Sequence, residues 1–289
     1  MTKMPLFRLL LSILFIFFAT IPLSGQGRGG QTPVAPAKAS APIDLTGYWT
    51  AVITEDWHVR MPTARKGDFG SGPPGALSQV GVGRLGEGAN PAQEGNIPYN
   101  LKGAQAAMAW DAAKDAAEGN PCKAYGAPGI MRQPTHLHFT WQDDYTLKME
   151  ADFGNQTRLF HFTKGVQPRG ALKSEAPAGL EPSLQGYTTA SWVIMGGGGQ
   201  SNYERSGSLK AVTNHLKPGY YWKNGMPYTG NAVLNENFFL LQLPDNSTWL
   251  TVTQLVEDPE YLNEPFVVNY HFKKLPDGSK WNPNACPVK

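Results

Sequence analysis

Apolar and polar residues alternate along most of the chain that follows residue 134. A period of two is typical of a β-strand that buries one face and exposes the other. With a similar run near residue 44, this pattern predicts nine strands: residues 44–53, 135–141, 146–152, 157–163, 187–195, 209–216, 232–241, 248–256 and 266–273. Turn residues such as Gly154-Asn155 and Asn224-Gly225 lie between them. Short strands joined by tight turns predict a mainly β fold, an antiparallel meander that closes as a barrel or forms a strongly curved sheet.

One segment, residues 101–118, has the periodicity of a helix instead. It is rich in alanine, its apolar residues Leu101, Ala104 and Met108 are three or four positions apart, and Gly119 follows as a stop signal. Residues 67–95 contain nine glycines without periodicity, which predicts a long glycine-rich loop. A G-x-G-x-x-G run in this loop lacks the preceding strand and following helix of a dinucleotide-binding turn, so it does not indicate a nucleotide site.

The start of the chain has the organisation of a secretory signal peptide. Lys3 and Arg8 precede an apolar run at residues 9–21, and the small residues Ser24 and Gly25 follow it. The run is shorter than the roughly 20 residues that a membrane-spanning helix needs. We therefore expect a cleaved signal at residues 1–25, a periplasmic or secreted protein, and no membrane span after cleavage.

The exported chain is expected to have two parts. Residues 26–42 are rich in Gly, Pro and Ala, which predicts a flexible tether. No change of composition divides residues 43–289, which should form one β domain. Four of the 25 basic residues and none of the 23 acidic residues lie before Ile43, so the domain carries 21 basic and 23 acidic residues, a net charge of −2. This balance argues against nucleic acid as a partner, because a nucleic-acid-binding protein would need a basic face.

The chain has two cysteines, Cys122 and Cys286. In an exported protein an even number of cysteines predicts disulfide pairing, and the alternative is two free, buried thiols. The bond would join the C-terminal end to the middle of the domain, and loop-entropy accounting gives so long a loop about 5 kcal/mol of stabilisation.

Residues 44–49, which end in Gly47-Tyr48-Trp49, resemble the entrance motif of the lipocalins, where an acidic and an aliphatic residue precede Gly-x-Trp. In that family the tryptophan closes the floor of the barrel, and a basic residue of the last strand packs across it. The resemblance covers the first strand and the overall meander. It implies a lipocalin-like (calycin-type) barrel in which Lys273 or Lys274 covers Trp49. Other segments resemble exported bacterial proteins of unknown function: residues 120–128, 141–144 and 256–259.

Histidines are concentrated in the middle strands. His136 and His138 are two residues apart and share one face of their strand, and His161 follows after one intervening strand. Three such imidazoles can form an open tetrahedral zinc site, which would activate a bound water molecule. The alternative is that they point outward or are hydrogen-bonded within the sheet. We expect no required cofactor, with zinc at these three histidines as the alternative.

A second polar group could support acid–base catalysis. Glu150 and Asp152 share one face of the strand that follows the histidine pair. If the sheet closes around a polar cavity, His138, Glu150 and Arg158 are the catalytic candidates, and we expect His138 to face the interior. If the apolar face of this strand points to the core instead, its charged residues are solvated.

A third group is aromatic and lies between residues 213 and 228. Aromatic side chains bury large areas while several keep a polar group, which suits a ligand-binding loop at the mouth of a cavity. The alternative is an aromatic turn that covers the end of the sheet. The candidate ligand-binding residues, including one from the last strand, are Tyr220, Tyr221, Trp222, Tyr228, His215 and His271.

Three classes of function remain. The leading hypothesis is an exported lipocalin-like protein that binds a small, partly apolar ligand in a central cavity. The alternative is a periplasmic enzyme on the same barrel, a lyase, isomerase or hydrolase that uses His, Asp and Glu with or without zinc. A third is an envelope protein whose aromatic loops bind a partner or a glycan. The chain contains no G-x-S-x-G elbow, H-E-x-x-H helix or P-loop, which argues against several hydrolase and nucleotide-using families.

Overall fold

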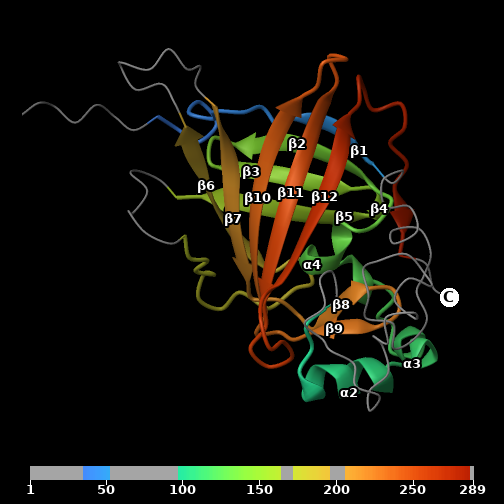
Figure 1. Cartoon of the computed structure of the whole chain (residues 1–289). Coiled ribbons are helices and arrows are strands. Elements are labelled where there is room, and N and C mark those ends of the chain that lie inside the picture. The colour runs from blue at the N-terminus through green and yellow to red at the C-terminus, as the bar shows by residue number, and fades with distance from the viewer. Residues whose placement is uncertain (1–34, 53–96, 164–171, 196–205, 287–289) are drawn as a thin grey trace, which may run out of the picture. The chain divides into compact units, whose positions relative to one another are not determined.

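The computed structural model describes residues 35–52, 97–163, 172–195 and 206–286. Within these ranges nine strands form a closed barrel in the order β1-β12-β11-β10-β7-β6-β5-β3-β2 (Figure 1). They are β1 (Gly47–Ala51), β2 (His136–Asp143), β3 (Thr146–Ala151), β5 (Gln156–Phe162), β6 (Tyr187–Met195), β7 (Ser206–Asn214), β10 (Val233–Gln242), β11 (Thr248–Glu257) and β12 (Phe266–Lys274). The predicted mainly β fold and its closure as a barrel are confirmed. The expected signal peptide at residues 1–25 and the loop at residues 67–95 lie outside the described residues.

Neighbouring strands of the barrel are antiparallel with one exception. β5 and β6 run parallel, with His161 opposite Thr189, so the chain departs from a simple meander at this point. A parallel pair needs a crossover connection rather than a tight turn. Because β1 pairs with both β2 and β12, the barrel has no open sheet edge.

The alternation along each strand separates the core from the outside. On β2, Leu137 and Phe139 are fully buried, whereas the residues between and beside them are half-buried on the opposite face. Phe139, Phe160 and Phe238 meet inside the barrel, with ring centroids 5.5 to 6.5 Å apart. At this level, aromatic side chains from three strands therefore pack against one another across the interior.

Trp49 is packed as the resemblance to lipocalins implies. Its side chain is fully buried, and its indole nitrogen donates a hydrogen bond to the carbonyl of Leu45 at 2.8 Å. Lys274 is its partner across the sheet, and the ammonium group lies 5.2 Å from the centre of the indole ring. Lys273 pairs with Thr50 and, by alternation, lies on the other face. Of the two candidates, Lys274 therefore covers the tryptophan.

Residues 35–42, expected to belong to a flexible tether, lie against the barrel instead. Ala37 is buried in the core, and its carbonyl accepts a hydrogen bond from the indole of Trp192 at 2.8 Å. The backbone nitrogen of Lys38 donates to the carbonyl of Asp144 at 3.1 Å. Figure 1 shows this segment, in blue, across the upper end of the barrel. The small side chains of this segment let its backbone approach the indole of Trp192 closely. The Gly-, Pro- and Ala-rich composition that predicted a tether therefore allows close packing at residues 35–42.

A smaller part of the molecule lies below the barrel in Figure 1. It contains α2 (Leu101–Ala109), α3 (Ala112–Ala117), the 3-10 turn η1 (Lys123–Tyr125), α4 (Ala127–Ile130) and a hairpin of β8 (Gly219–Trp222) and β9 (Met226–Tyr228). The single helix predicted at residues 101–118 is thus two helices. The interruption occurs because the carboxylate of Asp111 accepts hydrogen bonds from the backbone nitrogens of Ala113 and Lys114 and begins a new helix.

The predicted disulfide joins this lower part to the end of the chain. Cys122 and Cys286 are bonded, with Cα atoms 5.3 Å apart. Beside the bond, β4 (Phe153–Gly154) and β13 (Asn284–Ala285) form a short parallel pair. Cys122 directly precedes η1, so the bond fixes one end of this turn. None of the helices within the described ranges is long and apolar enough to cross a membrane.

Candidate functional site

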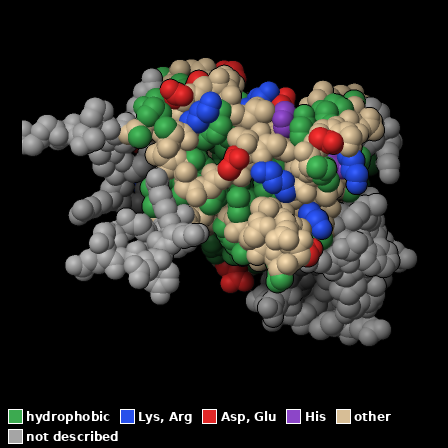
Figure 2. Space-filling view, turned by 90° about the horizontal axis from the view of Figure 1, so that it is seen from above, with side chains coloured by type: hydrophobic (Ala, Val, Ile, Leu, Met, Phe, Trp, Pro, Cys, Tyr) green, Lys and Arg blue, Asp and Glu red, His purple; other side chains and the backbone are tan. Residues whose placement is uncertain are grey.

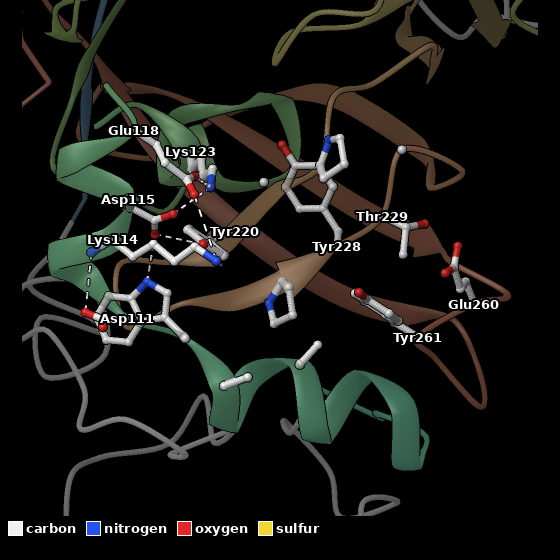
Figure 3. Close-up of a pocket in the computed structure, with 17 residues that line it drawn as sticks. Asp111, Lys114, Asp115, Glu118, Lys123, Tyr220, Tyr228, Thr229, Glu260 and Tyr261 are labelled. Carbon is white, nitrogen blue, oxygen red and sulfur yellow. Dashed lines mark hydrogen bonds and ion pairs between the residues drawn. The ribbon is translucent and has the colours of Figure 1, made fainter. Parts of the chain in front are cut away.

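A pocket of about 490 Å³ lies between the helices and the β8–β9 hairpin (Figure 3). The end of α2 and one face of α3 form one wall, the hairpin forms another, and the segment after β11 contributes the third. Its volume is typical of small-molecule sites. The residues that line it are Ala106, Ala109, Trp110, Asp111, Lys114, Asp115, Glu118, Lys123, Pro218, Gly219, Tyr220, Pro227, Tyr228, Thr229, Gly230, Glu260 and Tyr261.

Asp115 holds the aromatic walls of this pocket in place. One carboxylate oxygen accepts hydrogen bonds from the indole nitrogen of Trp110 at 3.0 Å and from the hydroxyl of Tyr220 at 2.7 Å. The other oxygen forms an ion pair with the ammonium group of Lys123 at 2.5 Å. Trp110 and Tyr220 consequently meet edge to face, with ring centroids 6.5 Å apart. A single carboxylate therefore connects α3, β8 and η1 and fixes the orientation of both rings (Figure 3).

Two tyrosines of the hairpin stay protonated in the pocket wall. Burial raises the pKa of Tyr220, and its hydrogen bond to Asp115 raises that pKa further. Burial also raises the pKa of Tyr228. The Tyr228 hydroxyl fits between two glycines, because a Cβ atom on Gly126 or Gly219 would come within 2.2 or 2.4 Å of it. Among the described residues this buried hydroxyl has no hydrogen-bond partner.

Carboxylates outnumber ammonium groups on the pocket wall. Lys102, which lies outside the lining, forms an ion pair with Glu260, and the resulting hydrogen bond lowers the pKa of that carboxyl. The lining carries four carboxylates and two ammonium groups, a net charge of −2, contributed by Asp111, Asp115, Glu118, Glu260, Lys114 and Lys123. This balance disfavours an anionic ligand.

Charged side chains of both signs are mixed on the described part of the face drawn in Figure 2. Lys and Arg side chains lie there among Asp and Glu side chains, interspersed with uncharged ones. The described part of this face therefore offers no continuous basic patch of the kind that nucleic-acid binding requires.

The structure divides the aromatic residues predicted as a ligand-binding loop. Tyr220 and Tyr228 line the pocket. Tyr221 and Trp222 are buried behind the lining. The ring of Tyr221 lies 5.4 Å from that of Tyr228, and the indole of Trp222 lies under the guanidinium of Arg132 at 4.4 Å. Two of these four aromatic residues therefore form the pocket wall, and the other two are buried behind it.

The two histidines assigned to the same site are not part of this pocket. His215 has a left-handed backbone, with φ of 59°, and its ring nitrogen contacts the carbonyl of Leu180. His271 lies on β12 opposite Thr251. Neither belongs to the pocket lining.

Several pocket residues carried no signal that sequence reasoning detected. Trp110, Asp115 and Glu118 fall in the segment predicted as one continuous helix, and Lys123 and Glu260 come from turns. Asp111 would have been the usable signal, because aspartate before an alanine-rich stretch is a typical helix start and places the preceding tryptophan at a break.

A second cluster lies on the outer side of β1, β2 and β3 and includes the residue that follows β3. We call it the histidine face: His136, His138, Lys148, Glu150, Asp152 and Tyr48. His138 stacks on Tyr48 with ring centroids 4.0 Å apart, and its Nδ1 lies 3.3 Å from Glu150. Lys148 contacts the same carboxylate at 2.9 Å. The expected inward orientation of His138 is wrong, because Leu137 and Phe139 occupy the inward positions of this strand.

His136 forms the tightest pair of the histidine face. Its Nδ1 lies 2.7 Å from the carboxylate of Asp152, which is almost fully buried. The other oxygen of Asp152 accepts hydrogen bonds from the backbone nitrogen of His136 at 2.7 Å and from the hydroxyl of Thr135 at 3.0 Å. This arrangement fixes the orientation of the imidazole.

The three histidines suggested as zinc ligands are not brought together. His161 is opposite Thr146 on β3, whereas His138 is opposite Glu150, four residues further along the same strand. At strand spacing this offset is about 13 Å. The His161 ring stacks on Tyr187 instead, at 4.7 Å, and burial lowers its pKa. Within the described ranges, no group of three His, Cys, Asp or Glu side chains is arranged to hold a metal ion.

Arg158 lies inside the barrel, away from the other catalytic candidates. Its guanidinium forms a fully buried ion pair with Glu236 and donates a hydrogen bond to Thr213 at 2.6 Å. The amide of Gln254 donates to Glu236 at 2.9 Å. His138 and Glu150 are therefore together on the outer face, and Arg158 belongs to a separate internal network.

Comparisons of the chain with protein-family models, with curated proteins and with solved structures found no match.

Proposed function

We propose that this chain is an exported, lipocalin-like barrel protein that binds a small, partly apolar ligand in the pocket between α3 and the β8–β9 hairpin. The observation that carries the proposal is the pair of aromatic walls, Trp110 and Tyr220, held by the carboxylate of Asp115 on one side of a space of about 490 Å³. Rings fixed in advance lose little freedom on binding, which favours affinity.

The proposal places the ligand beside the barrel rather than in a central cavity. Phe139, Phe160 and Phe238 pack against one another in the interior and belong to one cluster of buried apolar side chains. Below them, the network around Arg158 and Glu236 occupies the interior with its own polar groups. The pocket offers both apolar surface and polar groups, which a partly apolar ligand requires.

A native mass spectrum of protein purified from the periplasm tests this function. We expect a bound small molecule on the parent protein and its loss from Ala109→Trp, where an indole would fill the pocket from an exposed position of α2. Ala113→Trp is the matched control, because it adds the same side chain at an exposed helical position outside the lining. A bound molecule retained equally by both variants would contradict the proposed site.

One observation favours a second function, a periplasmic enzyme. The pair of His136 and Asp152, at 2.7 Å, resembles in geometry the base and its orienting carboxylate in hydrolases. His138 and Glu150 form a looser pair two residues away. We expect this function to appear as hydrolysis of 4-nitrophenyl acetate that His136→Gln abolishes without lowering the melting temperature. Equal rates for the parent and the variant would exclude it for this substrate class.

A further inference from the structure

The charge pattern of the pocket identifies a class of ligand, and this inference rests on the function proposed above. We infer that the ligand is a cationic amine with an apolar, ring-sized body. The ammonium group would lie on the α3 side, next to one of the two carboxylates at the ends of this helix, Asp111 or Glu118. The body would lie between Trp110, Tyr220 and Tyr228.

Three of the four acidic side chains of the lining belong to α3 and its two caps. Asp111, Asp115 and Glu118 are spaced four and three residues apart, so they share the face of α3 that lines the pocket (Figure 3). Asp115 is fully engaged by three donors. Glu118 has only longer ion pairs, 3.7 Å to Lys123 and 3.9 Å to Lys114. Its carboxylate therefore keeps capacity to accept hydrogen bonds.

Asp111 provides the second acceptor. One of its oxygens, Oδ1, accepts the backbone hydrogen bonds that begin α3. Within the described residues, Oδ2 receives no hydrogen bond. A carboxylate that caps a helix through one oxygen can accept an ammonium proton through the other.

The pocket already holds one ammonium group between a carboxylate and an aromatic ring. The Lys123 ammonium pairs with Asp115 and lies 5.7 Å from the centre of the Tyr220 ring. A cation near an aromatic face and beside a carboxylate is stabilised by both. A ligand amine beside a carboxylate and an aromatic ring of the wall would repeat this combination, whereas a carboxylate or phosphate would face a lining in which four carboxylates outnumber two ammonium groups.

The rest of the wall suits an apolar body. Apolar surface of the lining comes from Ala106, Ala109, Pro218 and Pro227. Thr229, Glu260 and Tyr261 lie on the side of the pocket away from α3 (Figure 3). The unpaired hydroxyl of Tyr228 lies in the same wall. The α3 side of the pocket therefore carries three of its four carboxylates together with both of its lysines, and apolar and aromatic side chains complete the lining.

Isothermal titration calorimetry of the exported protein with three matched probes tests the class. 2-Phenylethylamine, 2-phenylethanol and phenylacetate share a ring and differ in charge. We expect the amine to bind about tenfold or more tightly than the alcohol, the magnitude of one charge-assisted hydrogen bond. Phenylacetate should bind most weakly, and only the affinity for the amine should fall as salt is added.

Two variants locate the effect. Asp111→Asn keeps a good helix cap, and combined with Glu118→Gln it should reduce the affinity for the amine at least fivefold and leave that for the alcohol unchanged. Glu257→Gln, an exposed carboxylate on β11 outside the lining, is the control and should change neither affinity.

The outcomes separate this inference from the proposed function. If the alcohol binds as tightly as the amine and Ala109→Trp abolishes both, the pocket is a ligand site and the amine class is wrong. If the amine binds equally to the parent and to Ala109→Trp, both the class and the site are wrong. If no probe binds, the amine class is overturned, and the native mass spectrum decides the function independently.

Discussion

Replacing Glu236 with glutamine should destabilise the barrel strongly. The side chains of Arg158 and Glu236 are 1% and 0% exposed, and the guanidinium faces the carboxylate through both of its terminal nitrogens. Glu236→Gln would keep the shape of the side chain but leave the Arg158 charge buried without a counter-charge. Breaking a buried ion pair in this way costs about 3–5 kcal/mol. This is a large share of the roughly 5–15 kcal/mol that stabilises a typical domain.

Urea denaturation followed by tryptophan fluorescence measures the effect, with the double variant Arg158→Met/Glu236→Leu as the control. Removing both charges avoids the isolated buried charge, so the double variant should be more stable than Glu236→Gln even though Thr213 and Gln254 each lose one hydrogen bond. A loss below about 1 kcal/mol for Glu236→Gln would refute the reasoning, since the charge would then have to be solvated or neutralised.

Three further predictions concern the barrel floor, the disulfide bond and a buried tyrosine. Trp49→Ala removes a fully buried indole and should cost roughly 3–5 kcal/mol in urea denaturation, and an unchanged midpoint would show that Trp49 is peripheral. Alkylation of the denatured, non-reduced protein should find no free thiol at Cys122 or Cys286, and two modified thiols would disprove the bond. Burial raises the pKa of Tyr221 well above 10.0, whereas in the unfolded chain its phenol loses its proton near pH 10. The free energy of unfolding should therefore keep its full value below that pH and fall as the pH rises above it. Tyr221→Phe should reduce this fall.

The alternation of residues was sufficient to predict the barrel strands, but it did not determine which way each strand faces. All nine predicted strands are present, with ends that differ by a few residues. In β2, however, Leu137 and Phe139 alternate with His136 and His138, and either set could in principle face the interior. The apolar set faces the interior because burying a leucine and a phenylalanine side chain is more favourable in free energy than burying two imidazoles that need hydrogen-bond partners.

The pocket could be predicted only in part, because its walls depend on contacts between distant segments. Tyr220 and Tyr228 were detectable as an aromatic cluster with polar groups. Asp115 gains its role from Tyr220, which is 105 residues away in the chain, and no local pattern encodes that pairing. The break between α2 and α3 likewise depends on a capping hydrogen bond that competes with the helix propensity of the alanines around it.

The central claim is that the ligand lies beside the barrel, between α3 and the β8–β9 hairpin. Electron density from crystals of the protein, purified from the periplasm without unfolding, tests this most directly. The account predicts density for a small molecule against the rings of Trp110, Tyr220 and Tyr228. Density for a small molecule inside the barrel near Phe139 and Phe238, or on the histidine face, with solvent alone in the pocket, would contradict it.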